Sequence, residues 1–327
     1  MIRYAVIGRS VIAQNYIKGA KLSGKFTLVA VYSRDEKSGR EFAAKYGCSK
    51  VYTDLYQLAA DAEIDAVYIA SPNACHEIQS EILLKGQKHV ICEKPIATSA
   101  GAYKRLKLLA DKLGLIYMEA IIPRYVKTRE NIKEAICEIG DIAMARINYC
   151  QRSSRYDAHK RGERVNIFDM SLAAGTLMDL GIYCVYAAVD LLGMPQKIQA
   201  TASYLKNGAD GSGAAIFDYD SFVATLTYSK VGQSSVASEI VGDEGVVVIE
   251  RIGLYQGAYL YRDGQKSFLG REEEKEILMG AEADAFAEYI LGNRMEEYEK
   301  AGRLCGQVHS CMDEIKRCAN IKYGKLR

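Results

Sequence analysis

The first third of the chain alternates apolar runs with amphipathic stretches, and this alternation restricts the fold more than any other feature. Short runs rich in β-branched and aromatic residues have strand character, and the segments between them have helical periodicity. The expected strands are 2–7, 27–32, 66–70, 89–92 and 115–118, and the expected helices are 11–21, 37–46, 77–85 and 100–113. Helices between successive strands make the sheet parallel and cover both of its faces. We therefore predict an α/β domain with a doubly wound parallel sheet in residues 1–120.

The pattern changes beyond Pro123. After a helix at 127–138, most strand-like runs alternate apolar and polar residues and are joined by turns. These runs are 142–149, 199–204, 221–228, 234–241, 244–251 and 255–261, and a helical tail is expected at 282–318. Consecutive strands joined by turns indicate a mostly antiparallel open sheet. At 327 residues the chain is long enough for two domains. The second, an α+β domain, is expected at 121–327.

Composition excludes several classes of protein. A net charge of +2 gives no reason to expect a nucleic-acid or membrane partner. We expect no apolar stretch of bilayer-spanning length, and the amino terminus enters a strand rather than a signal peptide. The nine cysteines include no Cys-x-x-Cys pair, so neither a metal site nor a disulfide framework is expected. A cytoplasmic protein fits these features best.

The first strand ends in a turn that begins with Gly8. The run Gly8-Arg9-Ser10-Val11-Ile12-Ala13 fits the G-x-G-x-x-G/A pattern, with serine at the second glycine. Such a turn brings free N–H groups at a helix start against a pyrophosphate. The sequence therefore indicates dinucleotide binding through residues 8 and 10–12. An ordinary strand–turn–helix junction is the alternative.

The end of the second strand bears on the choice of dinucleotide. Enzymes that use NAD usually have a carboxylate there to hold the ribose 2′-hydroxyl. Here the order is Ser33-Arg34, and a hydroxyl followed by a guanidinium suits a 2′-phosphate. NADP(H) is therefore favoured, and Asp35 leaves NAD(H) possible. In the alternative, Arg34 is a solvated loop residue.

The strand at 89–92 runs directly into Glu93-Lys94-Pro95. Proline cannot donate to a sheet ladder, so the strand stops and leaves Lys94 at the carboxyl edge, where parallel sheets bind ligands. Partial desolvation there makes an ammonium lose its proton more easily. Lys94 is therefore a candidate for proton transfer, and a solvated lysine at a strand end is the alternative.

Asp179 and Tyr183 are four residues apart, so on a helix both project from one face. A phenol titrates near pH 10, and a nearby ammonium favours its phenolate. Lys94 and Tyr183 could thus supply charge and a proton to the same oxygen, if both face the same nicotinamide ring. The alternatives are a half-buried packing tyrosine and a surface carboxylate.

Four motifs together resemble the glucose–fructose oxidoreductase, inositol dehydrogenase and MocA-type family. They are the Gly8 turn, Ser71-Pro72-Asn73 followed by His76, Glu93-Lys94-Pro95, and the run from Gly175 to Tyr183. They occur in the family's order over essentially the whole chain. Glu119-Ala120 and Tyr183 resemble the dihydrodiol dehydrogenase-like branch. The chain departs from the family pattern at Ser10, where a glycine is usual, and at Ala174.

The resemblance implies an NAD(P)(H)-dependent oxidoreductase of carbohydrate metabolism, with a sugar, cyclic polyol or diol as substrate. Lys94, Tyr183 and Asp179 would be catalytic, and no metal is implied. The implied cofactor contacts are Gly8, Ser10, Val11, Ile12, Ser33, Arg34, Ser71, Pro72, Asn73, His76, Glu93 and Lys94. Residues 1–120 would bind the cofactor. Residues 121–327 would bind substrate and form a homodimer or homotetramer.

Two other functions remain open. One is a glycosidase that uses a tightly held nicotinamide for transient oxidation, and the other is a non-catalytic NADP-binding regulatory protein. The basic loop around His159 is interpreted as a flank of the substrate pocket or, equally, as a solvated run of charges.

Overall fold

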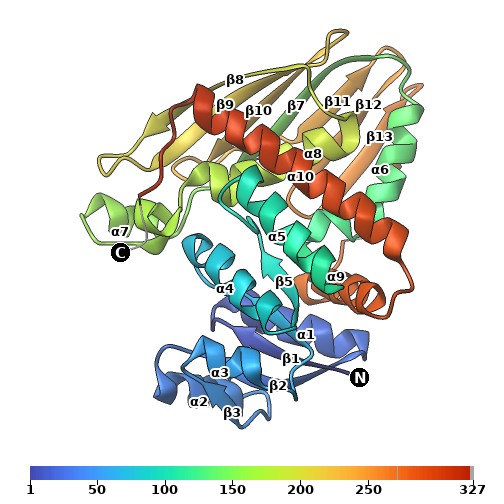
Figure 1. The fold of residues 1–327 in the computed structure, drawn as a ribbon. Helices are drawn as coiled ribbons and strands as arrows, with labels where there is room; N and C mark the ends of the chain where they lie inside the picture. The colour runs from blue at the N-terminus through green and yellow to red at the C-terminus, as the bar shows by residue number, and fades with distance from the viewer. Residues whose placement is uncertain (271, 325–327) are drawn as a thin grey trace. The chain divides into compact units, whose positions relative to one another are not determined.

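The computed structural model describes residues 1–270 and 272–324, which form two compact units (Figure 1). Unit 1 comprises Met1–Tyr125 and Glu273–Arg303. Unit 2 comprises Val126–Glu272 and the chain from Leu304 onward. The segment Glu273–Arg303 thus lies in unit 1, whereas the division drawn from the sequence assigned everything after residue 120 to the second domain.

Unit 1 contains a six-stranded parallel sheet in the order β3-β2-β1-β4-β5-β6. Its strands are β1 (Ile2–Ile7), β2 (Phe26–Tyr32), β3 (Lys50–Tyr52), β4 (Ala66–Ile69), β5 (His89–Glu93) and β6 (Tyr117–Ala120). This is the strand order of dinucleotide-binding Rossmann sheets, with the switch point between β1 and β4. The predicted fold class is confirmed. Only β3, three residues long, had no sequence signal.

Four helices that follow strands of the parallel sheet lie close to where the periodicity predicted them, and α3 (Leu55–Ala60) had not been predicted. The four are α1 (Val11–Ser23), α2 (Glu36–Ala44), α4 (Asn73–Lys85) and α5 (Ala100–Leu113). Four of the five begin at a serine or aspartate whose side chain accepts a main-chain N–H of the first turn. Such caps satisfy donors that would otherwise have no partner, so these residues fix where the helices start.

Residues 273–303 belong to unit 1 because α9 (Lys275–Ile290) packs closely against α1. A Cβ on Gly19 would come within 2.7 Å of the Gly280 nitrogen. The two main chains can approach this closely only because Gly19 has no side chain. Lys25 adds ion pairs to Asp284 and Glu288.

The tail expected to be helical at 282–318 is helical over most of its length, with one interruption. The structure has two helices, α9 and α10 (Met295–Cys318). Gly292, with φ of +78°, lies between them in a left-handed conformation that ends α9. The predicted apolar stripe of α10 is confirmed, because Leu304, Val308, Met312 and Ile315 are all buried.

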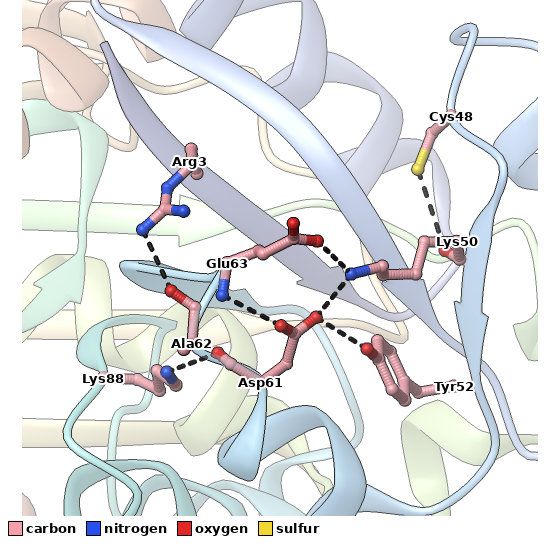
Figure 2. Close-up of polar contacts among 8 residues, drawn as sticks. All are labelled: Arg3, Cys48, Lys50, Tyr52, Asp61, Ala62, Glu63 and Lys88. Atoms are coloured by element: carbon pink, nitrogen blue, oxygen red, sulfur yellow. Dashed lines mark hydrogen bonds and ion pairs between the residues drawn. The ribbon is translucent and has the colours of Figure 1, made fainter.

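A charged network ties the loop between α3 and β4 to its neighbours (Figure 2). The Lys50 ammonium lies 2.8 Å from an Asp61 carboxylate oxygen, and the Tyr52 hydroxyl donates to the same oxygen at 2.6 Å. Glu63 also pairs with Lys50, and Lys88 donates to the Asp61 carbonyl. The Lys50 and Tyr52 bonds lower the pKa of Asp61. The network borders the amino ends of β4 and β5, opposite the edge where ligands bind, so its role is structural.

Unit 2 is built on an eight-stranded sheet in the order β14-β13-β12-β11-β7-β10-β9-β8. Its strands are β7 (Ile142–Cys150), β8 (Lys197–Tyr204), β9 (Asp210–Asp218), β10 (Val223–Ser229), β11 (Ser238–Gly242), β12 (Gly245–Arg251), β13 (Gln256–Arg262) and β14 (Gln265–Phe268). Only the β7–β10 pair is parallel. The predicted mostly antiparallel sheet is confirmed. Strands β9 and β14 had been missed.

The two faces of this sheet differ. Side chains such as Phe217, Leu226 and Ile147 are buried on one face, which packs against α6 (Thr128–Cys137) and α8 (Ile182–Leu192). Their strand neighbours alternate with them, and among these Ile216 and Val223 are exposed. The sheet therefore has one covered and one open face (Figure 1).

One stretch, Met170–Leu192, is long and apolar enough to cross a membrane by length and composition. The expectation that no stretch approaches this length is therefore wrong. In the structure 83% of its apolar window is buried, as in the core helix of a globular unit.

Candidate active site

The turn after β1 requires glycine for two reasons. Gly8 has a φ of +105°, which side chains rarely tolerate, and a Cβ there would lie 2.4 Å from the Ala70 carbonyl oxygen. The Ala70 N–H in turn donates to the Ile7 carbonyl. The turn thus passes directly over the end of β4, at the switch point where Rossmann sheets bind dinucleotides.

The start of α1 fits a phosphate. Ser10 is its N-cap, and the hydroxyl accepts the Ala13 N–H at 3.5 Å, a long hydrogen bond. Val11 is 70% exposed and Ile12 is half-buried. Their N–H groups are the first of the helix, where no intrahelical acceptor exists. A bound pyrophosphate would be held here by main-chain N–H groups and the positive end of the helix dipole.

The side chains that follow β2, from Ser33 to Asp35, make different contacts. Ser33 is buried, and its hydroxyl bonds to the main chain of Asp35. The Asp35 carboxylate caps α2 by accepting the Ser38 hydroxyl and N–H, which lowers its pKa. Arg34 is exposed and makes no ion pair within residues 1–270 and 272–324. Arg9 interacts electrostatically with Asp35, so two guanidinium groups flank this strand end. Arg9 was not singled out in the sequence, although it lies inside the glycine turn.

His76 links two loops. It is fully buried, with Nδ1 2.8 Å from the Pro95 carbonyl oxygen and Nε2 2.8 Å from the Ser71 carbonyl oxygen. Burial lowers its pKa. Pro72 precedes the first residue of α4, Asn73. His76 therefore ties the loop after β4 to the segment that follows Lys94, and its effect on a cofactor would be exerted through these two loops.

Buried acids surround the end of β5. Glu93 accepts the Tyr68 hydroxyl at 2.6 Å, and burial raises the pKa of Glu93. Glu282 of α9 is fully buried, and neither of its carboxylate oxygens has a hydrogen-bond partner among the residues described. Burial, and then the neighbouring Glu93, raise the pKa of Glu282 well above its ordinary value. Lys94 thus follows a strand end where burial raises the pKa of two acids. Nothing in the sequence around Glu282 indicated this position.

In unit 2, Asp179 and Tyr183 emerge from an otherwise buried segment. Between Gly175 and Val189, every residue but these two is buried. Residues Leu177–Gly181 form a π-helical turn that leads into α8. Asp179 and Tyr183 were predicted to share one α-helix, whereas Asp179 lies in the π-helical turn and Tyr183 in α8. Such turns occur frequently at functional sites. The Tyr183 ring packs against Tyr149 with centroids 5.6 Å apart.

Asp210, at the start of β9, supports this turn. Its carboxylate accepts the Leu177 N–H at 2.6 Å, and the Thr176 hydroxyl lies 2.9 Å from its carbonyl oxygen. A Cβ on Gly175 would come within 2.0 Å of the Asp210 carboxylate. The glycine at 175 is therefore required by the capping carboxylate. Asp210 had no sequence signal, because its role arises only when β9 lies beside the turn.

The basic loop lines a cavity of about 1270 Å³ in unit 2. Tyr156, His159 and Phe168 contribute aromatic walls, and Lys206 comes from the turn between β8 and β9. Most of the loop's charges are paired, as in Arg161–Glu163 and Arg164–Asp169. Of the two interpretations, a wall of a cavity fits this arrangement better than a free run of charges.

Known proteins resemble the chain over both units. Residues 2–121 match the model of the GFO/IDH/MocA oxidoreductase family with its NAD-binding Rossmann fold, and residues 129–248 match the family's C-terminal domain. The chain is 36% identical to the scyllo-inositol 2-dehydrogenase (NADP(+)) IolU of Bacillus subtilis, over 99% of this chain and 98% of that protein. It is 27% identical to the mouse trans-1,2-dihydrobenzene-1,2-diol dehydrogenase, over 77% and 75% of the two chains.

A solved structure shares the fold at lower identity. KijD10, a 3-ketoreductase from Actinomadura kijaniata in complex with NADP and TDP-benzene, has a TM-score of 0.85 and 20% identity over 97% of this chain and 98% of that one. Motifs, strand order and family matches agree. The chain belongs to the GFO/IDH/MocA family and is an NAD(P)-dependent oxidoreductase, as its motifs predicted.

Proposed function

We propose that the protein is an NADP(H)-dependent dehydrogenase of a cyclic polyol, with an inositol as the first substrate to test. The observation that carries the proposal is the emergence of a carboxylate and a phenol, Asp179 and Tyr183, from a segment that is otherwise buried. A polyol offers many hydroxyl groups, and both groups are suited to bind them. The name of the 36% identical relative, a scyllo-inositol 2-dehydrogenase, supports the same substrate class.

The preference for NADP(H) is argued from charge at the end of β2. Asp35, the first carboxylate after this strand, is committed to capping α2, and the next one, Glu36, pairs with Arg40. Arg34 has no ion pair among the described residues and is available to a 2′-phosphate, with Arg9 near it. The relative named above is also an NADP(+) enzyme.

A nicotinamide cofactor bound by unit 1 would supply the hydride transfer of the proposed reaction. Tyr183, as its phenolate, takes the proton of the hydroxyl that is oxidised, and the resulting phenol returns that proton in the reverse direction. The Lys94 ammonium stabilises negative charge on that oxygen, and Asp179 orients the substrate by accepting one of its hydroxyl groups. We also propose that the remaining predicted contacts, including Ser71, Asn73 and Glu93, bind the cofactor.

The test uses scyllo-inositol with NADP+ or NAD+, followed by absorbance of the reduced cofactor. We expect turnover with NADP+ and a loss of about 100-fold or more in kcat for Tyr183→Phe. Arg34→Ala should raise KM for NADP+ without raising KM for NAD+. The matched control is Arg40→Ala, in the same helix region, which pairs with Glu36.

Inactivity of the wild type toward inositols, aldoses and cyclic diols with both cofactors would refute the proposal. Cleavage of a glycoside with no net change in reduced cofactor would instead support the nicotinamide-dependent glycosidase. Binding of NADP+ without any turnover would support the regulatory protein.

Assembly and location belong to the same proposal. The open face of the unit 2 sheet exposes Ile216 and Val223, and apolar groups there favour pairing with a second copy as a homodimer or homotetramer. All nine cysteines lie in the described residues and none forms a disulfide there, which suits the reducing cytoplasm.

A further inference from the structure

We propose that Lys230 is a positioning residue of this active site, acting through Asp179; the inference rests on the proposed function. Lys230 follows β10, and its side chain is only 6% exposed. Its ammonium pairs with the Asp179 carboxylate, which is 41% exposed. One partner is therefore buried and the other reaches the surface, where a substrate could meet it.

The main chain of Lys230 is fixed independently of its side chain. Its N–H donates to the Gly211 carbonyl at 3.0 Å, and its carbonyl accepts the Ser153 N–H at 2.9 Å. The Thr176 hydroxyl also lies 2.8 Å from the Gly211 carbonyl oxygen. One short piece of β9 thus holds both the lysine and the entry to the turn that carries Asp179. Removal of the ammonium should leave this main-chain frame intact.

The Lys230 ammonium has an aromatic ring and a second carboxylate near it. Its Nζ lies 5.9 Å from the centroid of the Phe168 ring, which lines the cavity of unit 2. Lys230 also interacts electrostatically with Asp210, which is buried and caps the turn. Lys230 thus holds Asp179 by its charge from the buried side while the ring covers the ammonium. Separating the two groups would leave the buried Lys230 charge without its partner, which is strongly unfavourable. The ion pair therefore keeps the Asp179 carboxylate in place.

Two properties of the site follow. A carboxylate already bound to an ammonium is held in one orientation and can accept a substrate hydroxyl with its remaining lone pairs. The ammonium also occupies one of its oxygens, and in the proposed reaction proton transfer belongs to Tyr183. Misplacement of a substrate by about 1 Å can cost about 100-fold in rate, so loss of the lysine should act mainly on turnover.

The experiment is a double-mutant cycle on full-length protein with scyllo-inositol and NADP+. Lys230→Met should lower kcat/KM for scyllo-inositol by about 10- to 100-fold and leave KM for NADP+ unchanged. In an Asp179→Asn background the same substitution should change kcat/KM less than about twofold, because the lysine then has nothing to orient. Lys230→Arg should restore most of the loss. Lys197→Met, on the exposed start of β8, is the matched control.

The outcomes separate the two proposals. If the wild type is active but Lys230→Met has the same kcat/KM as Lys197→Met, the positioning role alone is overturned. The same holds if the effect of Lys230→Met on kcat/KM adds fully to that of Asp179→Asn. A Lys230→Met protein that fails to fold is replaced by Lys230→Gln and judged by the same cycle. A wild type that oxidises no polyol overturns the proposed function, and with it this inference.

Discussion

Asp210→Asn tests how the turn that carries Asp179 is stabilised. Asp210 is 1% exposed, and burial raises its pKa from 3.8 to about 6. One carboxylate oxygen accepts the Leu177 N–H, and the other has no partner among the described residues. The folded protein therefore holds this proton more tightly than the unfolded chain does.

The sign of the pH effect follows from that difference. Below about pH 4 the carboxyl is protonated in both states, and its contribution to stability is fully present. As the pH rises toward 6, the unfolded chain loses the proton first, so the free energy of unfolding falls. A shift of about 2 pKa units corresponds to a loss of about 3 kcal/mol, complete above about pH 7.

The asparagine keeps an oxygen for the Leu177 N–H but cannot ionise. We expect Asp210→Asn to lack the decline between pH 4 and pH 7, so that its stability relative to wild type improves over this range by about 3 kcal/mol. The absolute gain at pH 7.5 will be smaller if the amide N–H groups find no acceptor, which costs about 1–3 kcal/mol. The nearby Tyr228 hydroxyl has no partner among the residues described and could accept one of them.

The assay is urea unfolding followed by circular dichroism at several pH values between 4.5 and 7.5. Asp263→Asn is the control, because the Asp263 side chain is 86% exposed and its substitution should leave the slope unchanged. Equal pH slopes in wild type and Asp210→Asn would refute the argument that the buried carboxyl ionises at a cost.

Two further predictions concern unit 1. Gly8→Ala should raise the dissociation constant for NADP+ at least about 10-fold in calorimetry, because the new Cβ clashes with the Ala70 carbonyl and the φ of +105° is strained; unchanged affinity would contradict the tight turn. Glu282→Gln should reduce the loss of Tm as the pH is raised, because the raised pKa of Glu282 means that stability is lost as this acid ionises at rising pH. A Tm loss equal to that of wild type would contradict the buried acid.

Some elements could be predicted because their cause is local. Alternating apolar strands and capped helices specified the parallel sheet, and α5 was predicted at Ala100–Leu113, where it occurs. Strand β9 was missed because Gly211 and Gly213 weaken its strand signal. The reason for Gly213 lies in another strand, since a Cβ there would come within 2.5 Å of the Tyr228 ring.

The end of the chain shows the same limit. Its apolar stripe was visible in the sequence, but the break at Gly292 was not recognised. The attachment of α9 to α1 was also not predictable, because Gly19 and Gly280 lie more than 250 residues apart and neither has a local reason to be glycine.

The amino-acid sequence alone determined the family, the Rossmann sheet and the residue types suited to nicotinamide chemistry. Each of these is recorded in short motifs whose spacing is fixed by local geometry. The tertiary structure alone decided what surrounds those motifs: the Asp210 cap, the Lys230–Asp179 pair and the buried Glu282. Burial and charge pairing are properties of residues that meet in space, and a residue distant in sequence gives no local sign of them.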